Sequence, residues 1–345
     1  MLLMGLVSIY EHHLSLIARI IIDKIPKMLS GKERTITLEE LMSCESVELL
    51  KMRFVDKEIE NIFREGPEKQ IDWFESRASI KGIRQNHRNM DELLELFQRR
   101  NLFTHCNGIV NEIYISNVSE GYIRKNEINK GDRLSVDARY FEASLDLITE
   151  FGVKIIQMAW RKFEENSSDS ADVFLLRFCY NLLINGEYRL ALLSLEFALQ
   201  IRGERRDDVR RMFVVNNAIA HALVGSKKES LKILDSEDWS ASADNFKCCV
   251  AAVRGDVVEV VKLMKRIGKN GSISSTDYQE WPAFYSVRDQ MDFQRAFKSV
   301  FGISYIPSAV RKNGIVASLG PLAIALVKDS AQVALTDTGD AVTLN

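Results

Sequence analysis

Apolar side chains recur at intervals of three and four residues along most of the chain, which is the spacing of one helix face. The first such segment spans residues 6–29 and ends at Ser30-Gly31, a pair that can stop a helix. Further helices are predicted at residues 41–54, 55–63, 71–80, 90–118 and 137–164. The pattern therefore predicts an all-α domain in the first half of the chain.

Two stretches interrupt this helical pattern. Residues 117–136 are polar and alternate briefly at their end, which predicts a loop with a small hairpin or an extended excursion. Residues 166–170 read Asn-Ser-Ser-Asp-Ser and are typical of a linker. We therefore expect a boundary near residues 165–171, after a first domain at 1–165.

A repeated pattern occupies residues 171–300. Gly186, Gly225 and Gly255 each lie between two short helical stretches, as expected where a tight turn joins antiparallel helices. Modest side chains come five residues later and apolar ones nine residues later, namely Ala191, Ser230 and Val260, then Leu195, Leu234 and Met264. The pattern resembles the tetratricopeptide-repeat family, best between Asn185 and Ala198. Its glycine intervals of 39 and 30 residues depart from the usual 34, so the resemblance implies an irregular helical-repeat array.

Residues 301–345 form a C-terminal extension of different composition. From Ile315 onward the chain is rich in Ala, Val, Leu and Gly. Residues 331–344 alternate around Thr338-Gly339-Asp340, which predicts a short β-hairpin. A strand pair, a loose tail and a contact for another subunit all remain open for this extension.

Charge and cysteine content narrow the function classes. The chain has 46 basic and 48 acidic residues, so any nucleic-acid site must be local. Its five cysteines show no C-x-x-C spacing, which predicts free thiols and supports neither a zinc site nor a disulfide framework. We expect no metal and no cofactor.

Charged residues such as Glu11, Arg19 and Asp23 interrupt the apolar N-terminal segment, so we expect a core helix, no membrane contact and a cytoplasmic protein.

One cluster combines the groups that phosphate chemistry needs. On a helix Asn101 and His105 share a face, and the long side chain of Arg100, about 140° away from His105, can curl toward them. The imidazole can exchange a proton near neutral pH, the guanidinium can bind phosphate oxygens, and the amide can orient either. RNA cleavage by its own 2′-hydroxyl needs such a set. Arg-x4-His is also common by chance, and a solvated arginine beside a half-buried histidine is the alternative.

A resemblance that extends over more of the chain favours a role for this cluster in RNA cleavage. The string from Arg99 to Asn111, RRNLFTHCNGIVN, with Tyr114 shortly after it, resembles the signature region of the HEPN superfamily, within a likeness that covers roughly residues 5–160. The later KGDRLSV segment at residues 130–136 resembles the stretch C-terminal to that motif in some bacterial members.

The HEPN resemblance implies a helical bundle that pairs as a homodimer and forms one composite, metal-independent endoribonuclease site. It would make Arg100 the cation that contacts phosphate, Asn101 the polar residue next to it, and His105 the catalytic imidazole. Arg99 is an alternative cation, because Arg-x5-His also fits the family's spacing. Some members of the superfamily lack nuclease activity and serve as nucleotide-binding or scaffold modules.

Basic residues on both sides of the motif are candidate RNA contacts. They are Arg84, Arg88, Arg99, Arg124 and Lys125. Such cations can form a groove that tracks the RNA backbone, although nearby glutamates allow an ordinary charged surface instead. His12 and His13 on the first helix are weaker candidates to approach the site.

The function expected is a toxin or antiviral, abortive-infection effector that cleaves cellular RNA; the defence role rests on family association alone. The alternative is a non-catalytic scaffold whose helical repeats bind a protein or peptide partner. Nucleotide binding is disfavoured, because the sequence has no glycine-rich loop that could hold a phosphate.

Overall fold

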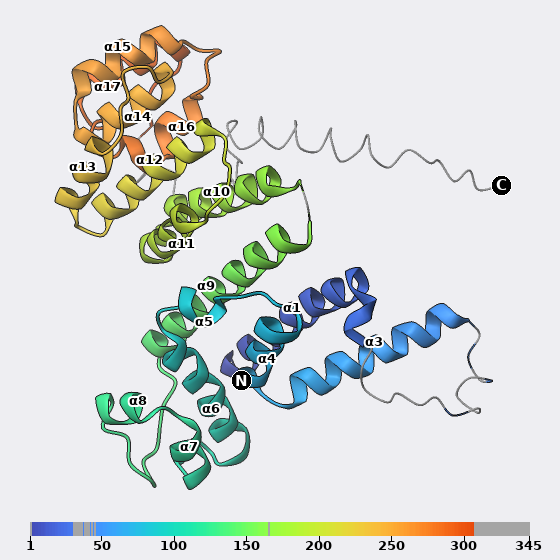
Figure 1. Cartoon of the computed structure of the whole chain (residues 1–345). Coiled ribbons are helices and arrows are strands. Elements are labelled where there is room, and N and C mark those ends of the chain that lie inside the picture. Colours follow the sequence, from blue (N-terminus) through green and yellow to red (C-terminus); the bar gives the residue numbers. More distant parts are fainter. Residues whose placement is uncertain are drawn as a thin grey trace. The chain divides into compact units, whose positions relative to one another are not determined.

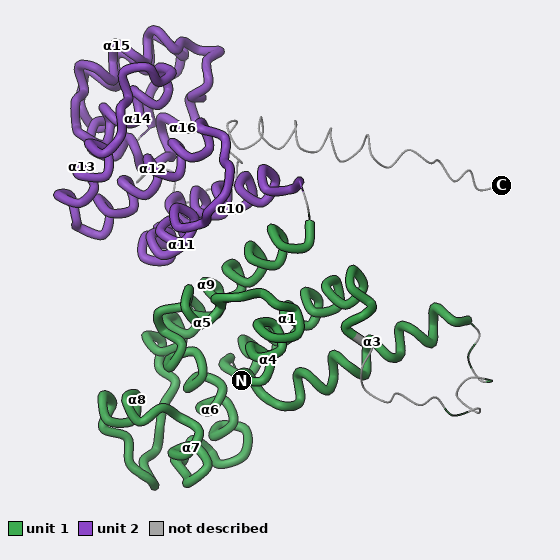
Figure 2. The backbone as a smooth tube through the Cα atoms, viewed as in Figure 1, with its two compact units in different colours: residues 1–165 green, residues 166–345 purple. Residues whose placement is uncertain are grey.

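The computed structural model describes residues 2–29, 37, 42, 44, 46–164 and 166–306 (Figure 1). About 73% of the structure is helical, and the described residues include one isolated antiparallel β-bridge between Ile109 and Arg133. The all-α prediction is confirmed. The chain divides into two compact units, residues 1–165 and 166–345 (Figure 2). The β-hairpin predicted at residues 331–344 lies outside the described residues.

Unit 1 packs its helices around a large apolar core and a second, smaller apolar cluster. Its α-helices are α1 (Leu2–Lys24), α3 (Val47–Arg64), α4 (Pro67–Asp72), α5 (Ile83–Asn86), α6 (Met90–His105), α7 (Glu112–Asn117), α8 (Glu120–Lys125) and α9 (Ala138–Phe163). Large buried side chains such as Leu14, Phe97 and Phe151 join α1, α6 and α9. The segments predicted separately at 41–54 and 55–63 contribute to a single helix, α3, whose first turn is capped by the Ser46 side chain.

Helix α6 ends at His105, so the prediction of one helix from residue 90 to 118 is wrong. Asn107 and Gly108 come next, with φ of 50° and 76°, and this conformation breaks the helix. A Cβ on Gly108 would lie 3.1 Å from the Leu134 carbonyl oxygen, so glycine is needed for this close approach. The predicted extended excursion is present here, because Leu134 N donates to Gly108 O at 2.9 Å.

Helix α8 occupies residues that the sequence assigned to a loop. Ser119 directly precedes α8, and its side chain accepts a hydrogen bond from Tyr122 N at the start of that helix. This N-cap is a helix-start signal, but Gly121 two residues later obscures it in the sequence. The prediction of a continuous loop between residues 117 and 132 is therefore wrong.

Helix α1 is the one described helix whose length and composition would let it cross a membrane. One of its faces is buried in the core of unit 1 through Leu6, Tyr10, Leu14 and Ile21. Its opposite face exposes Leu2, Ile9, Leu16 and Ile20. Through its buried face, α1 contributes to the apolar core of unit 1.

Unit 2 is a series of helical hairpins. Its α-helices are α10 (Ser168–Asn185), α11 (Tyr188–Gln200), α12 (Asp207–Leu223), α13 (Lys227–Asp235), α14 (Asp244–Arg254), α15 (Val257–Ile267), α16 (Ser275–Glu280) and α17 (Met291–Phe301). Gly186, Gly225 and Gly255 have φ of 87°, 88° and 85° and join the first three helix pairs. The residues five and nine positions after each glycine are buried, namely Ala191, Ser230 and Val260, then Leu195, Leu234 and Met264. The aligned glycines therefore mark true turns, and the tetratricopeptide family name stays a prediction.

Candidate functional site

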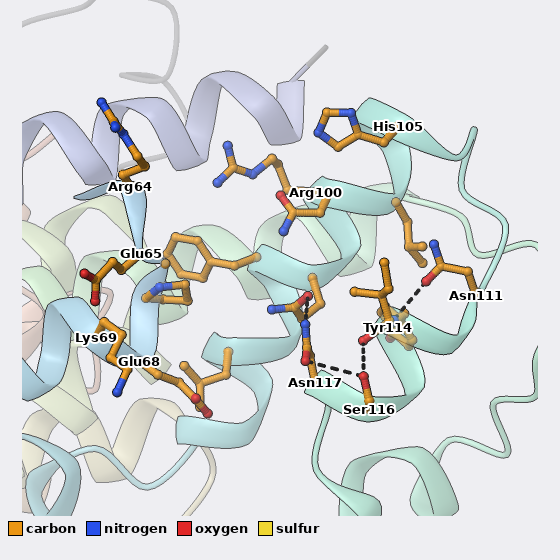
Figure 3. A pocket seen from close by; sticks show the side chains of 18 of the residues that line it. Arg64, Glu65, Glu68, Lys69, Arg100, His105, Asn111, Tyr114, Ser116 and Asn117 are labelled. Carbon is orange, nitrogen blue, oxygen red and sulfur yellow. Dashed lines mark hydrogen bonds between the residues drawn. The ribbon is translucent and has the colours of Figure 1, made fainter. Parts of the chain in front are cut away.

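An open cleft of about 750 Å³ lies beside α6 in unit 1 (Figure 3). Its lining comes from α6, from α7, from Glu11 on α1 and from residues 63–69, where α3 gives way to α4. Arg100, Asn101 and His105 all line this cleft. The three residues predicted to be catalytic therefore share one solvent-accessible space.

Arg100 is held by a residue that the sequence did not single out. Its Nη2 donates to Oε1 of Glu11 at 3.1 Å, and both side chains are 26% exposed. Glu11 precedes Arg100 by 89 residues, so no local pattern could indicate the contact. His12 and His13 are exposed on α1 and are not among the residues that line the cleft. Helix α1 thus contributes the carboxylate of Glu11 to the cleft and neither of the two histidines.

Asn101 and His105 lie on the last two turns of α6 and are exposed. Their four-residue spacing places them on the same side of the helix. Within the described part of the chain, neither side chain has a hydrogen-bond partner. Their amide and imidazole are therefore available to a ligand that enters the cleft.

Arg99 faces the other way, into the protein. Its Nε donates to Glu95 at 2.7 Å, its Nη1 donates to the Ser135 carbonyl at 2.9 Å, and its guanidinium lies 4.0 Å from the Tyr140 ring centre. It is buried and does not line the cleft. This buried position does not agree with the expectation that Arg99 contacts RNA or replaces Arg100 in the motif.

Glu95 is the centre of the buried network that holds Arg99. It accepts hydrogen bonds from three hydroxyls, those of Tyr114, Tyr122 and Tyr140. Burial, and after it the charge of Glu95, raises the pKa of Tyr140 well above its usual range, so this hydroxyl keeps its proton. These hydrogen bonds join α7, α8 and α9 to the buried face of α6.

The other cations predicted to bind RNA lie outside the cleft lining. Arg84 pairs with Asp72 and Glu75, Arg124 pairs with Glu120, and Lys125 lies 3.4 Å from Glu92. Arg88 is exposed. We therefore do not include these four residues in the candidate site.

Two further cations line the cleft at the turn between α3 and α4. They are Arg64 and Lys69, and the sequence analysis did not single them out. Glu65 and Glu68 line the same end, as Figure 3 shows. This end of the cleft therefore carries mixed charge and offers no simple cationic track.

Comparison with known proteins adds no assignment. No family model, no curated protein and no solved structure matches this chain. The HEPN and tetratricopeptide resemblances therefore stay predictions.

Proposed function

We propose that unit 1 is a metal-independent endoribonuclease of the HEPN type. The observation that carries the proposal is the convergence of Arg100, Asn101 and His105 on one open cleft, with Arg100 held there by Glu11. The cleft thus presents a cation, an amide and an imidazole to the same ligand. Cleavage of RNA by its own 2′-hydroxyl requires proton transfer and positive charge beside the phosphate, which an imidazole and a guanidinium can supply.

In the proposed reaction, the 2′-oxygen of the RNA attacks the adjacent phosphorus and the 5′-oxygen of the next nucleotide leaves. The attacking hydroxyl loses a proton and the leaving oxygen gains one. His105 exchanges one of these protons, because an imidazole does so near neutral pH. Arg100 binds the phosphate oxygens, where negative charge develops. Asn101 orients the phosphate or the imidazole.

One imidazole cannot accept and donate a proton in the same step, so the proposal includes a homodimer in which a second copy brings its own His105. Apolar side chains close to the motif support such a contact. Ile113 lines the cleft and is 66% exposed, and Ile109, just beyond the helix end, is 44% exposed. A second chain could bury both side chains while it completes the site.

The biological role proposed is that of a cytoplasmic toxin or antiviral effector whose RNA cleavage is held in check until it is triggered. This part rests on the family resemblance. Unit 2 would then receive the trigger or a protein partner.

A groove in unit 2 favours the second candidate function, a scaffold that binds a protein or peptide. It lies between α15 and α17 and has a volume of about 440 Å³. Val258 lines this groove and is 75% exposed, and Lys265 and Arg295 also line it. The scaffold function predicts partner binding without RNA turnover.

The test uses the purified full chain with labelled RNA in EDTA. We expect cleavage by the wild type and a loss of about 100-fold or more in both His105→Ala and Arg100→Ala. His12→Ala, which removes an exposed histidine outside the cleft lining, is the matched control and should retain full activity. Cleavage that persists in both cleft variants would remove the assignment. A wild type that binds partners but never cleaves RNA would favour the scaffold.

A further inference from the structure

We propose that Gln98 and Asn117 form a subsite that recognises one unpaired nucleobase beside the phosphate bound at Arg100. The inference rests on the proposed ribonuclease function and adds a determinant of substrate specificity to it. Both side chains line the same cleft as the catalytic candidates. Figure 3 shows Asn117 and its neighbour Ser116 on the α7 side of this cleft, away from Arg64 and Lys69.

Gln98 belongs to the stripe of α6 that faces the cleft. Leu94, Gln98, Asn101 and His105 all line it, at relative positions of zero, four, seven and eleven. Such positions lie within about 60° of one another around a helix, so the four side chains form one line. Gln98 precedes His105 by seven residues, which is about 10 Å along the axis. A base attached to the nucleotide at His105 can therefore reach Gln98.

The two amides are coupled in a way that leaves donors on Gln98 and an acceptor on Asn117 for a ligand. Asn117 Nδ2 donates to Gln98 Oε1 at 3.4 Å, and Ser116 Oγ lies 3.5 Å from Asn117 Oδ1. Gln98 Nε2 then keeps its hydrogens for a ligand, and Asn117 Oδ1 keeps a second lone pair. A neighbouring donor and acceptor match the edge of a nucleobase, which asparagine and glutamine side chains commonly bind.

The surroundings of this amide pair fit a base better than a phosphate. Leu94 and the exposed Ile113 line the cleft nearby and offer apolar contact to a ring. The lining cations are Arg64 and Lys69 at the α3–α4 turn and Arg100 at the motif. A phosphate would favour those cations, whereas neutral amides beside apolar side chains give sequence readout.

The subsite also selects for single-stranded RNA. In a paired A-form helix the Watson–Crick edge of each base is occupied by its partner, and side chains cannot enter the deep, narrow major groove. Only an unpaired base can turn its Watson–Crick edge toward Gln98 and Asn117. The substrate class inferred is thus a single-stranded segment with one preferred base next to the cleaved bond.

The experiment uses the full chain and four single-stranded oligonucleotides in EDTA. Each carries one ribose in an otherwise 2′-deoxy strand, and the four differ only in the base beside the cleaved bond. We expect the wild type to prefer one base by about tenfold in kcat/KM. Gln98→Leu and Asn117→Leu should each reduce this preference to about twofold or less, while cleavage of the other oligonucleotides continues.

The matched control is Asn126→Ala, which removes an exposed amide at the end of α8 that does not line the cleft, and it should keep the wild-type preference. Equal cleavage of all four oligonucleotides by the wild type would overturn the subsite and leave the ribonuclease proposal standing. An unchanged preference in both leucine variants would do the same. No cleavage of any RNA by the wild type would overturn the ribonuclease function and the subsite together.

Discussion

The polar side chains on the two faces of α6 differ in their burial and in their hydrogen bonding. On the buried face, Glu95 and Arg99 are hydrogen-bonded to each other and to their neighbours. On the cleft face, Asn101 and His105 are exposed, and within the described residues their side chains have no hydrogen-bond partner. A buried polar group needs a partner inside the protein, whereas an exposed one is free to bind a ligand. Arg99 lies on the buried face, whereas Arg100 is 26% exposed, pairs with Glu11 and lines the cleft, where we propose that it binds the substrate phosphate.

The largest expected effect comes from removing the centre of the buried face. Glu95→Ala leaves the charge of Arg99 buried without its counter-ion, and we expect a loss of about 3–5 kcal/mol in the free energy of unfolding. Glu92→Ala is the matched control on the same helix, because Glu92 pairs across 3.4 Å with a largely exposed Lys125 and should contribute less than about 1 kcal/mol. Urea unfolding of both variants measures the difference. Equal losses would contradict the stabilising role assigned to the buried Glu95–Arg99 pair.

A second prediction concerns a buried histidine. Among the described residues, neither ring nitrogen of buried His87 has a hydrogen-bond partner, although Nδ1 lies 3.7 Å from a carboxylate oxygen of Glu150, and the ring is in edge contact with Phe151. Burial lowers its pKa to about 4, although the charge of Glu150 opposes the shift. As the pH falls below about 6.5, the unfolded chain binds a proton that folded His87 does not, so stability is lost.

Between pH 7 and pH 5 this linkage should cost the wild type about 2 kcal/mol more than the variant His87→Gln, which cannot titrate. Urea unfolding of both proteins at the two pH values gives the double difference. The same pH dependence in wild type and variant would show that the pKa of His87 is the same in the folded and the unfolded chain. Burial would then not disfavour the charged form of His87.

The smallest expected effect lies at the end of α6. Gly108→Ala forces a side chain into a conformation with φ of 76° and places its Cβ 3.1 Å from the Leu134 carbonyl, so a loss of at least about 1 kcal/mol is expected. Gly121→Ala in α8 is the matched control. It meets nothing within 4 Å in a helical position and should be neutral or stabilising by up to about 1 kcal/mol. Thermal unfolding should show a lower midpoint for Gly108→Ala and an unchanged or higher midpoint for Gly121→Ala, and equal shifts would contradict the proposed need for glycine at the helix end.

The long helices were predictable from the sequence because each buries an apolar face, and the residues of such a face recur every three or four positions. The end of α6 at His105 was not, although Asn107-Gly108 is a turn signal, because apolar residues continue beyond it. The glycines of unit 2 could be identified because the same turn recurs three times. Repetition supplied the signal that the single turn after α6 lacked.

The candidate site was predictable only in part. Arg100, Asn101 and His105 are near neighbours in sequence, so a local motif could bring them together. Glu11 could not be found in this way, because tertiary packing of α1 beside α6 creates its contact with Arg100. Arg99 and Arg100 are adjacent and chemically identical, and only the position of the core separates their roles.

The most direct test of the ribonuclease proposal is the chemistry of the RNA ends. The full chain is incubated in EDTA with one RNA that is cut at a mapped position and with the same RNA carrying a single 2′-deoxy nucleotide on the 5′ side of that bond. We predict a 2′,3′-cyclic phosphate and a 5′-hydroxyl in the first case and no cut at that bond in the second. Cleavage of the 2′-deoxy bond, or products with a free 3′-hydroxyl, would contradict the proposed role of the cleft.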